Sequence, residues 1–201
     1  MLVDVRSILE LHAQTVARWH AEPLDNPYDG FAGLVCRQHQ FNFLLWHEED
    51  VARSPAVSDA RIAQVKRAID RYNQSRNDLI EKLDDEIAAE LQRRGVTVHP
   101  HARLNTETAG SAIDRLSILS LRIYHLQEQL ERPEATLAHL QSVAAKLQVC
   151  LAQRDDLSQA LERLEHDLGT GQARHRIFRQ LKMYNDPALN PYLNGQLPAA
   201  A

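Results

Sequence analysis

The sequence has few of the residues that build β-sheets, turns and disulfide frameworks. Aromatic residues make up 5% of its 201 residues, and it contains only 7 glycines and 8 prolines. Because strands favour aromatic and β-branched side chains and turns favour glycine and proline, this composition predicts a largely helical protein. The two cysteines, Cys36 and Cys150, fall within expected helices without the spacing of a zinc motif, which favours buried free thiols.

The sequence also lacks a long uncharged hydrophobic run and a block of charge of one sign. Its N-terminal residues, MLVDVRSILELHAQ, are polar at helical intervals, unlike a signal peptide or a membrane span. The 23 basic and 27 acidic residues alternate along the chain and give a formal net charge of −4. This distribution does not predict the basic surface that binds the phosphates of nucleic acid. We therefore expect a cytoplasmic protein that binds neither membranes nor nucleic acid.

Prolines, glycines and helix-capping residues divide the chain into five main helices and a short last one. The main helices are expected over residues 3–22, 29–53, 59–94, 106–132 and 134–168, and the short helix over residues 174–184. Residues 95–105 form an irregular connector, in which Val96-Thr97-Val98 could be a strand but has no evident partner, and residues 187–201 an extended tail. The prediction is one all-α domain over residues 1–201, an antiparallel helical bundle.

Leucines recur along residues 134–168 at alternating intervals of three and four, which is typical of a helix packed along another helix. Its partner is either the helix over residues 106–132 or a second subunit, and the short break at Pro133 favours a hairpin within one chain. A homodimer is nevertheless the expected assembly. The stripe consists of Leu137, Leu140, Ala144, Leu147, Leu151, Leu157, Leu161, Leu164 and Leu168.

Polar side chains lie on faces that should form the core. Projected at about 100° per residue, Arg76 falls in the middle of the apolar sector of its helix. Leaving a buried polar group unpaired costs about 1–3 kcal/mol, so such residues should form either an internal hydrogen-bonded network or a ligand site. The other inward polar residues are Gln38, Asn42 and Glu49 on the second helix and Asn73, Asn77 and Asp84 on the third.

Antiparallel folding should bring these residues into one layer of the bundle. It is expected to place His12 near Gln38, His39 and Asn42 near Asp70 and Asn73, and His125 near Arg76. Asp114 and His125 are about 16 Å apart along their helix, so they cannot act as one catalytic pair unless the helix is broken.

A second pattern concerns metal binding. Glu81 and Asp84 are similar to the second of the paired ExxE and ExxD motifs with which all-helical nucleoside triphosphate pyrophosphohydrolases hold Mg²⁺. The first motif is replaced by His47-x-x-Asp50, and antiparallel folding would leave an axial gap of roughly 25–30 Å between the two groups within one chain. Phosphate-binding glycine loops, a nucleophile elbow and the Glu-x-x-His pairs of di-iron bundles do not occur in the sequence.

Several motifs together resemble one bacterial family. They are FNFLLWHEED at residues 41–50, YNQSRNDLIE at 72–81, GSAIDRLSIL at 110–119 with Tyr124-His125, and RQLKMYND at 179–186. They are similar to the family called domain of unknown function 4254, whose members often occur near genes for glycan assembly. The resemblance implies a role around sugar or sugar-nucleotide metabolism, and it points to His47, Asp50, Asn73, Arg76, Asn77, Asp78, Glu81, Asp114, Arg115 and His125.

The leading hypothesis is an enzyme or binding protein for a small anionic metabolite, such as a sugar phosphate or nucleotide. Arg76 and Arg115 would hold the anion and His125 would act as general acid or base. The remaining candidates are Asn73, Asn77, Asn42 and Gln38 for ligand binding, Asp114 for catalysis, and Glu81, Asp84, His47 and Asp50 for a metal such as Mg²⁺. The alternatives are a non-catalytic helical adaptor that dimerises and a Mg²⁺-dependent pyrophosphohydrolase-like enzyme.

Overall fold

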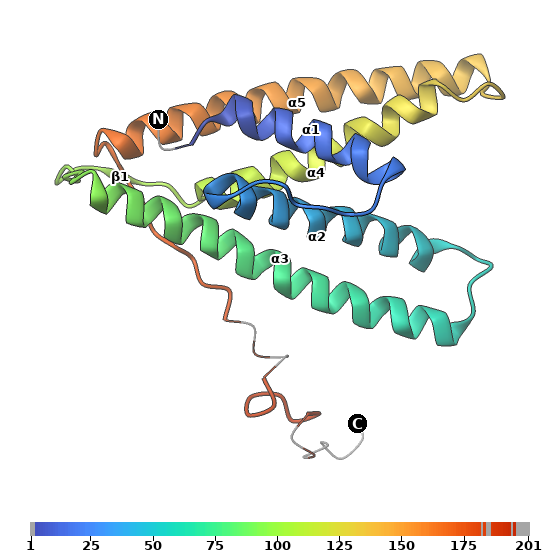
Figure 1. The fold of residues 1–201 in the computed structure, drawn as a ribbon, viewed down its shortest axis with the longest axis horizontal. Helices are drawn as coiled ribbons and strands as arrows, with labels where there is room; N and C mark the ends of the chain where they lie inside the picture. Colours follow the sequence, from blue (N-terminus) through green and yellow to red (C-terminus); the bar gives the residue numbers. More distant parts are fainter. Residues whose placement is uncertain (1–2, 182, 184–185, 194, 196–201) are drawn as a thin grey trace.

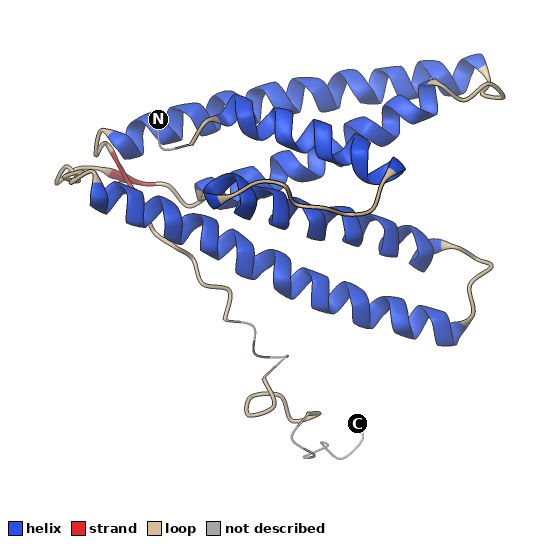
Figure 2. Cartoon of the chain, viewed as in Figure 1, coloured by secondary structure: helices blue, strands red, loops and turns tan. Residues whose placement is uncertain are grey.

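The computed structural model describes residues 3–181, 183, 186–193 and 195. Over these residues the fold is all-α, as predicted, and no described helix is both long and apolar enough to cross a membrane. Figure 1 shows the order of the elements, and Figure 2 shows the single parallel pairing of two short strands among the helices. The elements are α1 (Val5–Ala21), α2 (Gly30–Arg53), α3 (Asp59–Arg93), β1 (Arg103–Leu104), α4 (Ala109–Leu130), α5 (Leu137–Gly169) and β2 (Ala173–Arg174).

Side-chain caps explain where four of the helices begin. The carboxylate of Asp4 and the hydroxyls of Ser58, Thr108 and Thr136 each accept a hydrogen bond from a backbone N–H in the first turn of α1, α3, α4 and α5. Such caps satisfy amides that have no partner within the helix. The chain passes through a positive φ of 64° at Gly95, immediately after α3 ends.

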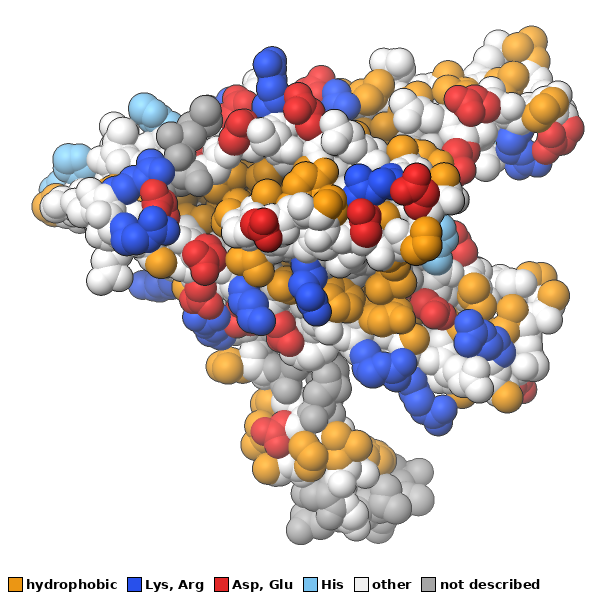
Figure 3. Space-filling model, viewed as in Figure 1, with side chains coloured by type: hydrophobic (Ala, Val, Ile, Leu, Met, Phe, Trp, Pro, Cys, Tyr) orange, Lys and Arg blue, Asp and Glu red, His pale blue; other side chains and the backbone are white. Residues whose placement is uncertain are grey.

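Two helical hairpins and one additional helix make up the body of the molecule. Helices α2 and α3 pack along each other, as do α4 and α5, and α1 packs mainly against α4 (Figure 1). Helix α4 contacts each of the other four helices, so it lies at the centre of the bundle. The face in Figure 3 carries interspersed acidic and basic side chains.

The leucine stripe of α5 faces α4, which confirms the hairpin within one chain. Leu147, Leu161 and Leu168 are buried against the main core, whereas Leu137, at the start of α5, is 71% exposed. On α4 the buried residues Ile113, Leu116 and Leu121 fill the centre of this core.

The predicted helix over residues 174–184 is wrong over its described part. Ala173–Arg174 pairs with Arg103–Leu104 as a parallel strand, and the described residues that follow form no α-helix along α3. Polar contacts with α3 compete with helix formation there: Arg179 binds Glu81 and Asp85, and the backbone N–H of Gln180 donates to Glu81. Residues 182 and 184 of the prediction lie outside the described part of the chain.

The connector and the tail also differ from expectation. The connector over residues 95–105 is largely irregular, as predicted, and Val96-Thr97-Val98 forms no strand; the difference is the short strand β1 at its end, which finds its partner in β2. Residues 187–193 form turns rather than an extended tail, and residues 194 and 196–201 of that prediction lie outside the described residues.

Candidate functional site

A buried carboxylate on α4 organises the polar residues of the bundle. Asp114 is 7% exposed, and its Oδ1 accepts hydrogen bonds from Gln38 Nε2 and from Asn42 Nδ2, the latter at 2.9 Å. Arg76 on α3 brings its Nε to 3.7 Å from the same oxygen. The helical projection thus identified three residues that do meet, Gln38, Asn42 and Arg76, although it did not identify Asp114 as their common partner.

Ser117, one turn further along α4, extends this network towards α1. Its Oγ accepts a hydrogen bond from Asn42 Nδ2 at 2.8 Å and lies 2.6 Å from Nδ1 of His39. The ring of His39 in turn packs against that of His12, at 4.5 Å between centroids. We call Asp114, Gln38, Asn42, Ser117 and His39 the Asp114 layer.

Burial dominates the electrostatics of this layer. It raises the pKa of the Asp114 carboxyl, an effect opposed first by the charge of Arg76 and then by the hydrogen bonds from Asn42 and Gln38. Burial lowers the pKa of His12 to about 3 and, together with the neighbouring His12, that of His39 well below its ordinary range. Both imidazoles are therefore neutral at physiological pH.

A pocket of about 400 Å³ opens beside the Asp114 layer, between α2, α3 and α4. Arg76 enters it with a quarter of its side chain exposed, and its buried Nε has no hydrogen-bond partner among the described residues. The lining residues are Asn42, Leu45, Trp46, Glu49, Asp50, Arg53, Arg76, Ile118 and Leu121. Charged and amide groups lie beside an apolar wall, a combination that suits a small polar metabolite.

Four predicted ligand-binding residues, Gln38, Asn73, Asn77 and Arg115, lie outside this lining. Asn77 is buried and Asn73 half-buried on α3. Arg115 lines a separate pocket of about 570 Å³ between α4 and α5, where its Nη1 donates to Glu107. Arg76 and Arg115 therefore do not share one pocket.

The structure does not assemble the predicted metal set of Glu81, Asp84, His47 and Asp50. Glu81 binds Arg179, and Oδ1 of Asp84 accepts a hydrogen bond from the backbone N–H of Gly110 at 2.8 Å. Since α2 and α3 are joined near their ends by residues 54–58, Asp50 lies near the start of α3 and Glu81 well towards its end. The separation expected from helix geometry is what keeps the two pairs apart.

His125 does not lie beside Arg76, so that expectation was wrong. Arg76 reaches Asp114, and α4 continues unbroken for about 16 Å from Asp114 to His125, which also keeps these two from acting as a pair. The ring of His125 instead stacks on Trp46 of α2, with centroids 4.8 Å apart and planes at 12°.

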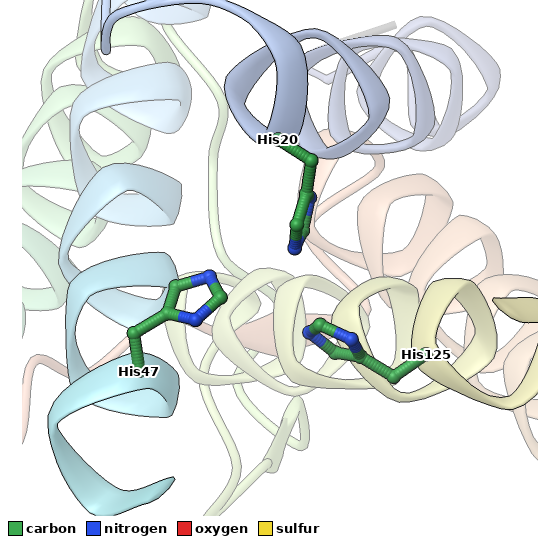
Figure 4. A group of neighbouring side chains, drawn as sticks. All are labelled: His20, His47 and His125. Atoms are coloured by element: carbon green, nitrogen blue, oxygen red, sulfur yellow. The ribbon is translucent and has the colours of Figure 1, made fainter. Parts of the chain in front are cut away.

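Three histidines converge where α1, α2 and α4 meet. His20, His47 and His125 each offer a ring nitrogen, and these nitrogens lie within 4.8 Å of one another. Figure 4 shows the three rings pointing toward a common centre. His20 was not among the predicted site residues, because α1 was expected to fold along α2. A signal for it in the sequence is the abundance of histidine, 10 in the chain. We call these three residues the histidine cluster.

Comparison with known proteins identifies a family but no activity. Residues 32–177 match the family described as "Protein of unknown function (DUF4254)". The chain belongs to this family. The match to DUF4254 contains the whole Asp114 layer, together with His47 and His125, whereas His20 precedes it. No curated protein and no solved structure matches the chain.

Proposed function

We propose that the protein is a cytoplasmic enzyme or binding protein for a small anionic metabolite, bound in the pocket between α2, α3 and α4. The observation that carries this proposal is the guanidinium of Arg76. It is permanently charged and three-quarters buried, and its nearest carboxylate oxygen, on Asp114, already accepts two amide hydrogen bonds. A phosphate or carboxylate in the pocket would supply the missing acceptors.

The rest of the pocket favours a ligand that carries hydroxyl groups as well as an anion. Glu49 and Asp50 provide acceptors for hydroxyls, while Leu45, Trp46 and Leu121 provide an apolar wall on which a sugar or base could pack. The second arginine of the lining, Arg53, is held by Glu49 through an ion pair of 3.1 Å. Sugar phosphates and nucleotide sugars fit this arrangement, and the glycan-assembly context implied by the family resemblance points to the same compounds.

Ligand-induced thermal stabilisation tests the proposal. The wild-type chain should gain thermal stability with inorganic phosphate, hexose phosphates or nucleoside diphosphate sugars, in proportion to ligand concentration over Kd. Arg76→Met removes one charged hydrogen-bond partner, which is worth about 1.5–3 kcal/mol and should weaken binding by about 10- to 100-fold. Titration calorimetry with the best compound of the screen measures this loss.

Arg115→Met is the matched control, because it makes the same change in charge on the other side of α4. It should leave the affinity of the Arg76 pocket unchanged. A structural adaptor would behave differently: the wild type would respond to none of these compounds, and Arg76→Met would keep its oligomeric state and lose little stability or gain some. That pair of results would reject ligand binding.

A further inference from the structure

The histidine cluster presents three electron-pair donors to one point. Nε2 of His20, His47 and His125 is in each case buried and without a hydrogen-bond partner among the described residues. A buried polar atom without a partner is costly, and three such atoms lie together here.

Two of the rings are held so that Nε2 carries the lone pair. Nδ1 of His20 lies 2.7 Å from the carbonyl oxygen of Val16, and Nδ1 of His125 lies 2.7 Å from Oε2 of Glu128. Both partners accept, so in the neutral rings the proton resides on Nδ1. Carbonyl and carboxylate partners fix metal-binding histidines in this same tautomer.

Aromatic packing fixes the ring positions. His20 stacks on Tyr124 at 4.3 Å between centroids, Trp46 stacks on His125, and Phe43 meets the edge of His47 at 4.4 Å. These contacts hold the three rings around one centre, as Figure 4 shows.

We propose that His20, His47 and His125 form a three-histidine site for a divalent transition metal ion, with Zn²⁺ as the best fit. Three nitrogen ligands with no thiolate suit zinc or a neighbouring first-row metal, whereas Mg²⁺ prefers oxygen ligands. In a tetrahedral site with bonds of about 2.0–2.1 Å, the ligand nitrogens lie roughly 3.3 Å apart. The ring nitrogens lie within 4.8 Å of one another, so the ion would draw them closer together.

Such a site would leave one coordination position open. Three protein ligands plus a water or substrate is the arrangement of catalytic zinc sites, whereas structural sites use four protein ligands. Trp46 lines the Arg76 pocket and stacks on His125, so the two sites share one side chain. The metal site does not depend on the proposed anion site, because its ligands come from other residues.

Metal binding by an untagged, chelator-treated full-length chain tests the proposal. Calorimetry with ZnCl₂ should show one ion per chain, and Co²⁺ should give the intense visible absorption of tetrahedral coordination. His20→Gln, His47→Gln and His125→Gln should each abolish this absorption. His139→Gln, an exposed histidine of α5, is the matched control and should retain it.

Glu128→Gln tests the positioning of His125 without removing a ligand. Glu128 lies on the surface, so this variant should fold as the wild type does, and its zinc affinity should fall by about 10- to 100-fold. Three results would overturn the proposal: no stoichiometric binding by the wild type, an octahedral Co²⁺ spectrum, or equal losses in His47→Gln and His139→Gln.

Discussion

The Asp114 layer and the histidine cluster both use α2 and α4, yet their polar atoms are satisfied in opposite ways. In the Asp114 layer, the amides of Gln38 and Asn42 donate to the carboxylate of Asp114, and Asn42 also donates to the hydroxyl of Ser117, so donors meet acceptors within the protein. In the histidine cluster, three ring nitrogens come together, and Nε2 of each has no partner among the described residues. The first arrangement pairs most of its polar atoms internally, although Gln38 Oε1, His39 Nε2 and Arg76 Nε remain without a hydrogen-bond partner in the described part of the chain, whereas the second has the position at which we propose a metal ion.

The largest expected effect is on stability without any ligand. Asp114→Ala should lower the free energy of unfolding by about 3–5 kcal/mol, because it leaves Arg76 and two buried amides without their acceptor. His47→Gln in metal-free protein should cost only about 1 kcal/mol, since Nε2 of His47 has no hydrogen bond to lose. Urea unfolding measures both.

Asp114→Asn is the control for side-chain volume. It keeps a carbonyl acceptor and should lose less stability than Asp114→Ala. Equal losses in Asp114→Ala and metal-free His47→Gln would remove the distinction between the two regions.

A smaller effect is expected from acid, through the fully buried His12 and His39. Their folded pKa values lie below the ordinary value of 6.5, so below that pH the unfolded chain takes up protons that the folded chain does not. Each group changes the free energy of unfolding by about 1.4 kcal/mol per pH unit, so stability should fall by about 2–3 kcal/mol between pH 6 and 5.

His12→Leu isolates one of these contributions. It should halve this fall, and it should not destabilise the protein at pH 7, because neither ring nitrogen of His12 has a hydrogen-bond partner among the described residues. The raised pKa values of Asp114 and Asp84 favour the folded state as pH falls. The wild type and His12→Leu both contain these carboxyls, so their contribution cancels in the comparison. An unchanged slope in the variant would contradict the neutral burial of His12.

The smallest expected effect concerns the contact that holds α3 on α4. A Cβ at Gly110 would lie 2.7 Å from the carbonyl oxygen of Ile80 and 2.9 Å from Asp84 Oδ1. Gly110→Ala should therefore cost about 1–3 kcal/mol, whereas Arg122→Ala on the exposed face of α4 should cost little. Because α3 contributes Arg76 but no ligand of the histidine cluster, the variant should weaken phosphate binding more than zinc binding, as paired titrations would show.

Local signals in the sequence were enough to predict the five main helices, and they predicted part of the Asp114 layer. Helix α3 begins at Asp59 as predicted, with Ser58 as its cap, and the projection of Arg76, Gln38 and Asn42 towards the interior is confirmed. Which element each residue meets was harder to predict, because packing between helices depends on the whole bundle. Helix α1 was expected to fold along α2, but it packs mainly on α4, and this packing brings His20 to His125.

The C-terminal error has a different cause. Residues 174–184 have a helical pattern, but Arg179 has two carboxylates of α3 within reach and the preceding residues have a strand partner in β1. These partners are far away in sequence, so local propensity could not reveal them.

The pairing of β1 with β2 also bears on the order in which the chain folds. Arg103 meets Ala173 across the whole α4–α5 hairpin, whereas the contacts within each hairpin join residues closer in sequence. Closing a long loop costs entropy that only an already compact chain can recover. We therefore expect the two hairpins to form early and the strand pairing to close late, so that the C-terminal segment docks onto a bundle that is already assembled.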